Sequence, residues 1–245
     1  TLEELQIEQA IAREALRLAF IQHKKFAVGL KGVQKQRTIA DAFRQHGEDT
    51  LVQMMDLDLI VGSGGVLSHA PRRVQSMRMM IDAFAPEGVT EMAVDSIFMM
   101  PHLGVLSTVN EEAATEVFEK DCIIYLGTCI SPMEVTSDLK TVFSLEMQNP
   151  DGTTLSRTFG ADEMVLLPLA DGTMADATLT PLHKTIDVGA GPGKSWTGQL
   201  RGGVVGLVVD TRGRPIRLSA DGAKRTESLQ TWVGELGEYP VQGGE

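Results

Sequence analysis

The sequence predicts an α/β fold over residues 1–132 and a mainly-β part over residues 133–245, which ends in a helix. Three observations support this division. Apolar residues near the start of the chain recur with a period close to 3.6, as in an amphipathic helix. A continuous apolar run at 57–61, bounded by glycines, is typical of a strand that is buried on both faces. After Pro132 helical periodicity disappears, and short extended runs alternate with turns.

The helices are predicted from their periodicity and from their end signals. Thr1 and Glu4 have the spacing of a capping box, so the first helix begins at the first residue. Pro71 suits the first turn of a later helix, where its missing N–H costs nothing. Asn110 is a good N-cap for a short acidic helix. The expected helices cover residues 1–25, 39–45, 69–84, 111–118 and 223–236.

The other apolar or alternating runs are expected to be extended. Asn149-Pro-Asp-Gly152 predicts a hairpin turn, because proline presets one turn angle and glycine tolerates a positive φ. Residues 210–214 are expected to form a second hairpin turn, between strands at 204–209 and 215–218. The remaining expected extended segments are residues 57–61, 91–108, 122–126, 141–147, 154–159 and 164–169.

The composition excludes several classes of protein. The chain has 22 Lys and Arg against 33 Asp and Glu, a net charge of −11, which repels nucleic acid and anionic lipid, so neither is expected as a partner. No apolar run is long enough to span a bilayer, and no export signal is recognisable. Cys122 and Cys129 are too few for a disulfide framework or a four-ligand zinc site. We therefore expect a cytoplasmic protein with two reduced cysteines.

A glycine-rich turn, Gly-Ser-Gly-Gly, follows the apolar strand and precedes a helix. Ligands of open α/β sheets bind beyond the carboxyl ends of such strands, and glycines let the backbone approach a flat or anionic group. This pattern favours a bound nucleotide, and a plain strand-to-helix turn without a ligand is the alternative. The expected nucleotide-binding residues are Gly62, Ser63, Gly64, Gly65 and Val66, with Ser68 and Arg72 as further loop contacts.

Two common phosphate motifs are excluded by their spacing. Leu67 stands where the pattern Gly-x-Gly-x-x-Gly requires its third glycine. The segment 185–195 resembles a Walker A loop, but Val188 occupies the position of its first glycine and no helix follows. A structural or partner-binding loop is the better interpretation of that segment.

No catalytic residue and no metal site are predicted. Ser68 and His69 are adjacent in sequence, which does not orient a base onto a nucleophile, and the histidines lack metal-ligand spacing. Asp95 and Asp187 follow apolar runs, so each is either an acid at a strand end or, more commonly, a cap or turn residue.

The order of elements around the glycine turn is similar to that of the adenosine loop in the actin, Hsp70 and sugar-kinase superfamily. In those proteins a strand, a glycine turn and a helix lie against the nucleoside, after a helix that also touches the base. Here a helix at 1–25 precedes the strand, the glycine turn and the helix at 69–84.

Four separated blocks of the chain resemble the MutL/GlmL family, the accessory proteins encoded beside adenosylcobalamin-dependent glutamate mutase. The family is unrelated to the mismatch-repair protein of the same name. The blocks are Val61-Gly-Ser-Gly-Gly-Val-Leu-Ser-His-Ala-Pro-Arg-Arg73, Phe98-Met-Met-Pro-His-Leu-Gly-Val-Leu-Ser107, Asp187-Val-Gly-Ala-Gly-Pro-Gly193 and Gly202-Gly-Val-Val-Gly-Leu-Val-Val-Asp-Thr-Arg-Gly-Arg-Pro215.

The resemblance implies an actin-like ATPase fold and a role in reactivating a B12-dependent mutase by exchange of damaged cobalamin. It implies ATP or ADP with Mg²⁺ as cofactor in the full-length protein and mutase subunits as partners, while no cobalamin is expected to bind this chain directly. The β-rich part would dock onto the partner.

One departure from the superfamily pattern qualifies this expectation. The chain has neither of the Asp-x-Gly-x-Thr phosphate loops of the actin-like ATPases, and Asp187-Val-Gly-Ala-Gly191 is the nearest match. The chain also begins at Thr1, inside an expected helix, so we expect the C-terminal portion of a longer protein. It would supply the adenosine side of the site without the groups that hold Mg²⁺ and the γ-phosphate.

Two other classes of function fit the same residues. The first is a small-molecule kinase or a hydantoinase-like transferase of the same superfold, which would place an acidic base against the γ-phosphate. The second is a pure interaction module, in which residues 133–245 dock onto a mutase and the α/β part only carries them.

We predict that this chain alone hydrolyses no ATP and binds adenine nucleotide weakly, because the phosphate loops are absent. Isothermal titration calorimetry with ATP and Mg²⁺, together with a phosphate-release assay, measures both properties. Submicromolar ATP binding by this chain would contradict the prediction.

Overall fold

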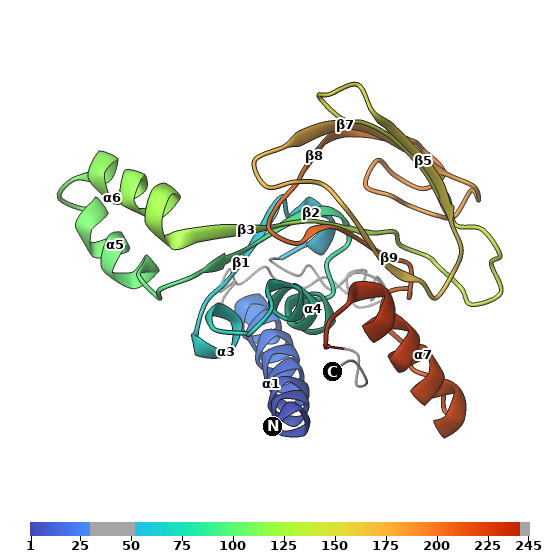
Figure 1. The fold of residues 1–245 in the computed structure, drawn as a ribbon, viewed down its shortest axis with the longest axis horizontal. Coiled ribbons are helices and arrows are strands. Elements are labelled where there is room, and N and C mark those ends of the chain that lie inside the picture. The colour runs from blue at the N-terminus through green and yellow to red at the C-terminus, as the bar shows by residue number, and fades with distance from the viewer. Residues whose placement is uncertain (30–51, 241–245) are drawn as a thin grey trace, which may run out of the picture.

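The protein, seen in a computed structural model, is a mixed α/β structure with two sheets, and the structure describes residues 1–29 and 52–240. Figure 1 shows three layers: the four-stranded sheet lies above the five-stranded sheet, and α1, α4 and α7 lie below it. The α/β class predicted from sequence is thus confirmed. The helix expected at 39–45 lies outside the described residues.

The five-stranded sheet has the order β1-β2-β3-β9-β6. β1 runs parallel to β2, β3 runs antiparallel to β2, and β9 runs parallel to β3. β6 and β9 lie beyond the predicted boundary at residue 132, so strands from both parts of the chain share this sheet. Its strands are β1 (Leu59–Gly62), β2 (Gly88–Asp95), β3 (Ile123–Ser131), β6 (Met164–Leu167) and β9 (Gly206–Asp210).

The four-stranded sheet is antiparallel, with the order β5-β4-β7-β8. The β4–β5 hairpin turns at Asn149–Gly152 as predicted, and the Gly152 φ of 84° is the positive angle that the turn requires. Its strands are β4 (Phe143–Gln148), β5 (Thr154–Phe159), β7 (Met174–Pro181) and β8 (Trp196–Arg201).

The helices begin and end at recognisable signals. The amide of Glu4 donates to Thr1 Oγ1 at the start of α1, and Asp221 caps the first turn of α7. Asn110 caps α6 by accepting from the amide of Ala113, as predicted. The helical elements are α1 (Leu2–Gly29), η1 (Met54–Asp56), α3 (Gly65–Ser68), α4 (Arg73–Phe84), α5 (Met100–Ser107), α6 (Glu111–Val117), η2 (Phe118–Cys122) and α7 (Gly222–Leu236).

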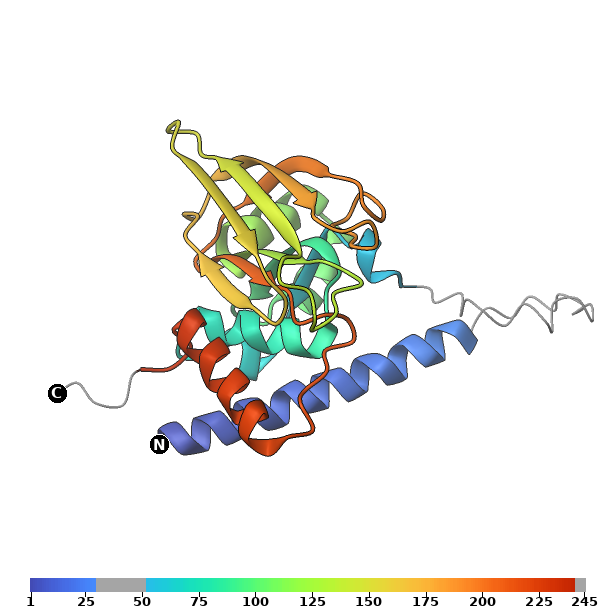
Figure 2. The ribbon, with the colours of Figure 1, turned by 90° about the vertical axis from the view of Figure 1, so that its right-hand side faces the viewer.

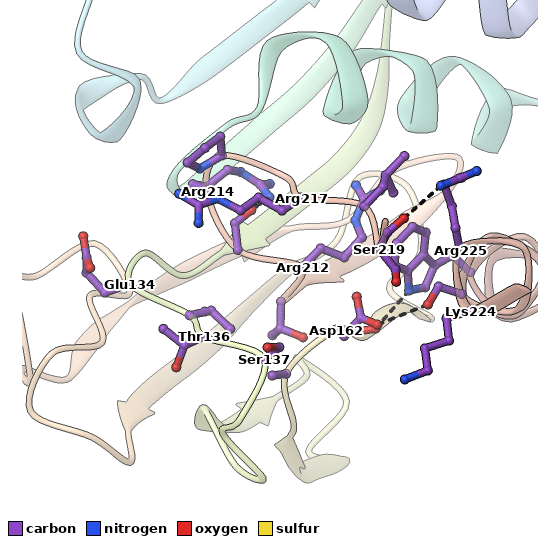
Figure 3. Close-up of a pocket in the computed structure, with 18 residues that line it drawn as sticks. Glu134, Thr136, Ser137, Asp162, Arg212, Arg214, Arg217, Ser219, Lys224 and Arg225 are labelled. Atoms are coloured by element: carbon purple, nitrogen blue, oxygen red, sulfur yellow. Dashed lines mark hydrogen bonds between the residues drawn. The ribbon is translucent and has the colours of Figure 1, made fainter. Parts of the chain in front are cut away.

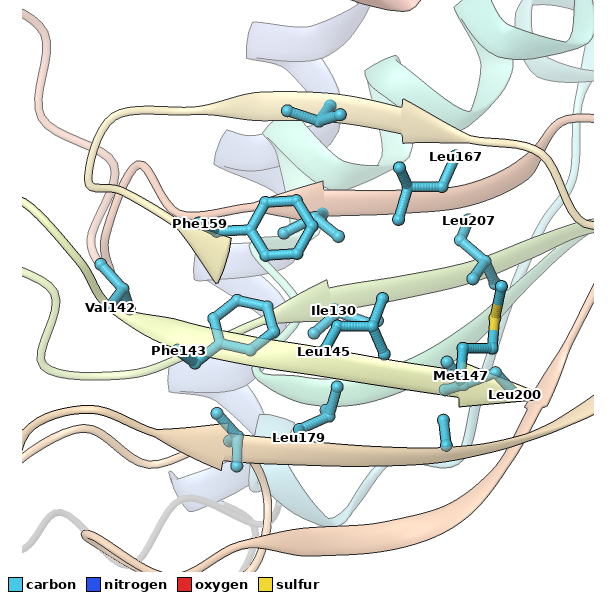
Figure 4. Packing of buried hydrophobic residues seen from close by; sticks show 14 of the residues in the cluster. Ile130, Val142, Phe143, Leu145, Met147, Phe159, Leu167, Leu179, Leu200 and Leu207 are labelled. Carbon is cyan, nitrogen blue, oxygen red and sulfur yellow. The ribbon is translucent and has the colours of Figure 1, made fainter. Parts of the chain in front are cut away.

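The first hydrophobic core fills the space between the two sheets (Figure 4). The rings of Phe143 and Phe159 stack at a centroid distance of 5.0 Å, and Leu145 lies opposite Leu179 across β4 and β7. Alternate residues of β9 divide between the two faces of the five-stranded sheet, as the pleat requires: Leu207 belongs to this core and Val208 to the other.

The second core lies between the five-stranded sheet and the helices. The methionines of α4, with Met92 and Val208 from the sheet, are among its most deeply buried members. α1 covers the outer side of α4, where the rings of Phe20 and Phe84 meet edge to face at 5.4 Å (Figure 2). Burial on both faces explains why the inner strands β3 and β9 read as continuous apolar runs. The same burial predicted for residues 57–61 is wrong: β1 lies at the edge of the sheet, where Leu59 is exposed and Ile60 and Val61 are half-buried. Within residues 1–29 and 52–240, no helix combines the length and apolar character of a membrane span.

The extended segment predicted at 91–108 is wrong over its second half. The strand ends at Asp95, and α5 occupies Met100–Ser107. Pro101 lies in the first turn of α5, where proline is favoured.

The helix predicted at 69–84 begins four residues later, at Arg73. Pro71 disfavours helical backbone angles at the residue before it, Ala70. The chain therefore leaves the helical conformation between the end of α3 and the start of α4.

The second predicted hairpin is also wrong. Residues 215–218 form no strand, and β9 pairs with β3 and β6 instead. The chain folds back at Asp210 because its carboxylate accepts from the guanidinium groups of Arg212 and Arg214, at 2.8 and 2.9 Å.

A buried cluster of charges joins the sheet to the helices. Arg212 reaches from the end of β9 to Asp82 of α4 at 2.7 Å, and Asp82 also accepts from Arg78 at 2.8 Å. Arg13 of α1 pairs with Asp82 at 3.7 Å and with the buried Glu238 near the C-terminus. Burial alone would raise the pKa of Asp210, but the adjacent Arg212 and Arg214 outweigh it and hold that pKa well below its usual range.

We predict that Asp210→Asn lowers the free energy of unfolding by about 3–5 kcal/mol, because it removes a carboxylate that two buried guanidinium groups share. The exposed Asp171→Asn is the matched control, with an expected change within about 0.5 kcal/mol. Chemical denaturation measures both.

The pH dependence has a defined sign. Because the folded pKa of Asp210 is depressed, its stabilisation is present above the unfolded pKa of about 3.9 and is lost as pH falls towards the folded value. The stability of the wild-type protein should therefore fall more steeply below about pH 4 than that of Asp210→Asn. Parallel curves would contradict this assignment.

Candidate functional site

The glycine turn and Asp95 lie together at one edge of the five-stranded sheet. β1 and β2 are parallel, and Gly62 is in register with Val94, so the two strands end side by side. The hydroxyl of Ser63 donates to Asp95 Oδ2 at 3.3 Å. The carboxyl ends of a parallel pair are the usual place for a ligand in an open α/β sheet.

The carboxylate of Asp95 holds the loop that follows β2. It accepts from the amides of Ile97, Met99 and Met100 at 3.4, 3.2 and 3.1 Å. Burial alone would raise the pKa of Asp95, but these backbone N–H groups and the hydroxyl of Ser63 outweigh it, so the pKa lies below its ordinary value. The sequence allowed Asp95 to be either an acid at a strand end or a cap or turn residue, and these contacts are those of a cap or turn residue. Through Ser63, Asp95 also holds the glycine turn.

The glycines of the turn have different surroundings. A Cβ on Gly62 would lie 2.7 Å from Met80 Sδ and 2.8 Å from Leu67 Cδ1, so this glycine permits the approach of α4. A Cβ on Gly64 or Gly65 would meet nothing within 4 Å, and the Gly64 φ of 106° is one that other residues rarely adopt. Gly64 and Gly65 therefore leave bare backbone at an open surface, next to the half-exposed Val66.

Two of the predicted contacts point elsewhere. Ser68 is buried, and its hydroxyl donates to the carbonyl of Asp95. The guanidinium of Arg72 donates to the carbonyl of Gly237 at 2.9 Å, beside the C-terminal end of α7. Of the seven predicted residues, Ser63, Gly64, Gly65 and Val66 share the open face.

The loop that resembles a Walker A motif folds around its own aspartate. Asp187 Oδ1 accepts from the amides of Gly189 and Gly191 at 2.8 and 3.0 Å, and the amide of Gly193 donates to the carbonyl of Ile186. These amides are the groups with which such a loop would hold a phosphate. Because these amides already donate to Asp187 and to the carbonyl of Ile186, the segment has the contacts of a structural loop.

The described part of the chain contains no group of three His, Cys, Asp or Glu side chains arranged to hold a metal ion. Cys122 and Cys129 are free thiols and both are buried. Burial raises the pKa of Cys129 to about 12, so this thiol is a poor nucleophile at neutral pH.

A cavity of 640 Å³ lies at the opposite edge of the same sheet, where the parallel strands β3 and β9 end. Sequence reasoning missed it, because its walls come from four separate segments. The sequence contains part of the signal for this cavity. Five cationic residues lie within 14 positions of an acidic chain: Arg212, Arg214, Arg217, Lys224 and Arg225.

These features define an α/β protein with an open glycine turn at the carboxyl ends of the parallel strands β1 and β2. The family model described as MutL protein matches residues 1–122, and the chain belongs to this family. The family predicted from the sequence blocks is thereby confirmed. The searches of curated proteins and of solved structures found no match.

We predict that Gly62→Ala lowers the free energy of unfolding by about 1–3 kcal/mol, because the added methyl group overpacks the contact with Met80 and Leu67. Gly65→Ala is the matched control, since its methyl group meets no neighbour. Chemical denaturation of both variants compares them. Equal losses at both positions would contradict this account of the turn.

Proposed function

We propose that this chain is part of an ATP-dependent reactivating protein for a B12-dependent glutamate mutase. In this proposal it contributes the adenosine side of a nucleotide site. The observation that carries it is the open, side-chain-free face of Gly64 and Gly65 at the carboxyl ends of β1 and β2, in a member of the MutL protein family.

The geometry of the turn supports a flat ligand. Gly62 and Asp95 are buried and fix the turn from behind, while Ser63 and Val66 flank the bare backbone. A purine ring can lie against backbone only where no Cβ intervenes, and this condition is met at Gly64 and Gly65. The actin-like arrangement of the complete site, with Mg²⁺ and the phosphates held by other groups, belongs to the same proposal.

The mutase partner is assigned to the β-rich part. The outer face of the four-stranded sheet is covered by no other element of the described structure and carries polar side chains such as Glu146, Ser156 and Asp176 (Figure 1). A polar face of this kind suits a reversible protein contact, since transient interfaces are about as polar as the rest of a protein surface.

The proposal predicts that, in the complete gene product, Gly65→Asn raises the ATP concentration needed for half-maximal mutase reactivation by tenfold or more. The new side chain would occupy the space of the nucleoside, whereas nothing in the protein itself opposes it. The assay incubates inactivated glutamate mutase with intact cobalamin, the protein and a series of ATP concentrations.

Gly234→Asn is the matched control, because Gly234 lies exposed on α7 and its Cβ would also meet no neighbour. This variant should behave like the wild-type protein. An unchanged ATP dependence in Gly65→Asn would remove the glycine turn from the nucleotide site, and absence of any reactivation by the wild-type protein would overturn the proposed function itself.

A further inference from the structure

The cavity at the β3–β9 edge is cationic on an acidic protein. Five Lys and Arg residues and two acidic residues line its 640 Å³, while the whole chain carries a net charge of −11 (Figure 3). Its walls are the loop after β3, the loop before β6, the loop after β9 and the start of α7. Its location is that of a ligand crevice, beyond the carboxyl ends of two parallel strands.

Two of the cationic side chains are already paired with a carboxylate of the protein. Arg212 and Arg214 are almost fully buried and are held by the carboxylate of Asp210, as described above. They hold the loop after β9 in place. Their role is to form one wall of the cavity, and we assign them no ligand contact.

The other three cations retain free donors. Neither the guanidinium of Arg217 nor the ammonium of Lys224 has a polar partner within residues 1–29 and 52–240, and both residues are exposed to solvent. The guanidinium of Arg225 donates once, to the carbonyl of Ser219 at 2.9 Å. Arg217 comes from the loop after β9, and Lys224 and Arg225 come from the first turn of α7 (Figure 3).

The acidic lining residues are fewer than these cations. The carboxylate of Asp162 accepts from the hydroxyl of Ser228 at 3.4 Å. Glu134 lies at the other end of the cavity from Lys224 and Arg225 (Figure 3). The α7 end of the cavity therefore presents a surplus of cationic donors.

The rest of the lining suits an organic group. Trp232 closes the cavity from α7, with its indole N–H donating to the carbonyl of Asp162 at 2.9 Å, and Val135 and Leu218 add apolar surface. A volume of this size lies in the range of small-molecule sites, of about 300–1,000 Å³, and exceeds what a bare inorganic anion needs.

We propose that this cavity binds a small organic phosphate, whose phosphoryl group is bound by cationic donors among Arg217, Lys224 and Arg225 and whose organic part lies towards Trp232. Lys and Arg together are the usual partners of phosphate oxygens. This site goes beyond the nucleotide site proposed above, because β3 runs antiparallel to β2 and places the cavity and the glycine turn at opposite edges of the sheet.

The test uses Trp232 as a reporter. The chain has two tryptophans, so Trp196→Phe leaves Trp232 alone, and its fluorescence is followed during titration with pyrophosphate and with ribose 5-phosphate. We expect a saturable change with both compounds and none with ribose. Calorimetry with the unsubstituted 245-residue chain gives the same comparison without relying on the tryptophan substitution.

The double variant Arg217→Glu/Lys224→Glu should lower the affinity for pyrophosphate and for ribose 5-phosphate by tenfold or more. The double variant Lys184→Glu/Lys194→Glu changes the net charge equally at exposed positions outside the cavity and should leave their affinities unchanged. Gly65→Asn should also leave them unchanged, which separates this site from the nucleotide site. Absence of saturable phosphate binding, equal binding of ribose, or an equal loss in both double variants would overturn the proposal.

Discussion

The carboxylate of Asp210 is the contact on which the arrangement of the layers depends. It lies at the end of β9 and binds Arg212 and Arg214, and Arg212 also donates to Asp82 of α4. Arg13 extends the same cluster to α1. One buried anion therefore orients two guanidinium groups that would otherwise be costly to bury, and through them it fixes both the helices and the loop that forms the cavity wall.

Strand direction separates the two candidate sites. β1 and β2 end at one edge of the sheet and β3 and β9 end at the other, because β2 and β3 are antiparallel. The end of the first pair presents bare glycine backbone at an open surface, and the end of the second pair borders a cavity with cationic side chains. The two ligand sites proposed above would therefore lie at opposite ends of the strands of one sheet.

Local signals explain which predictions were confirmed. The helix at 223–236, the capped α6 and the hairpin at Asn149–Gly152 depend on side chains within a few residues, and sequence reasoning found all three. The predictions were wrong where a side-chain contact that no local turn or capping pattern signals decides the conformation. The proline in α5 lies in the first turn of a helix whose first amide, that of Met100, donates to Asp95, and the residues after β9 turn back to Asp210 rather than into a strand.

The sequence by itself determined the α/β class, the family and the position of the glycine turn, because periodicity, turn residues and motif blocks are properties of short segments. Only the tertiary structure decided that Ser68 and Arg72 face away from the turn while Gly64 and Gly65 stay open. It also decided that the cations from 212 to 225 gather around a cavity. Those outcomes depend on which strands become neighbours and in which direction they run, and no local pattern encodes this.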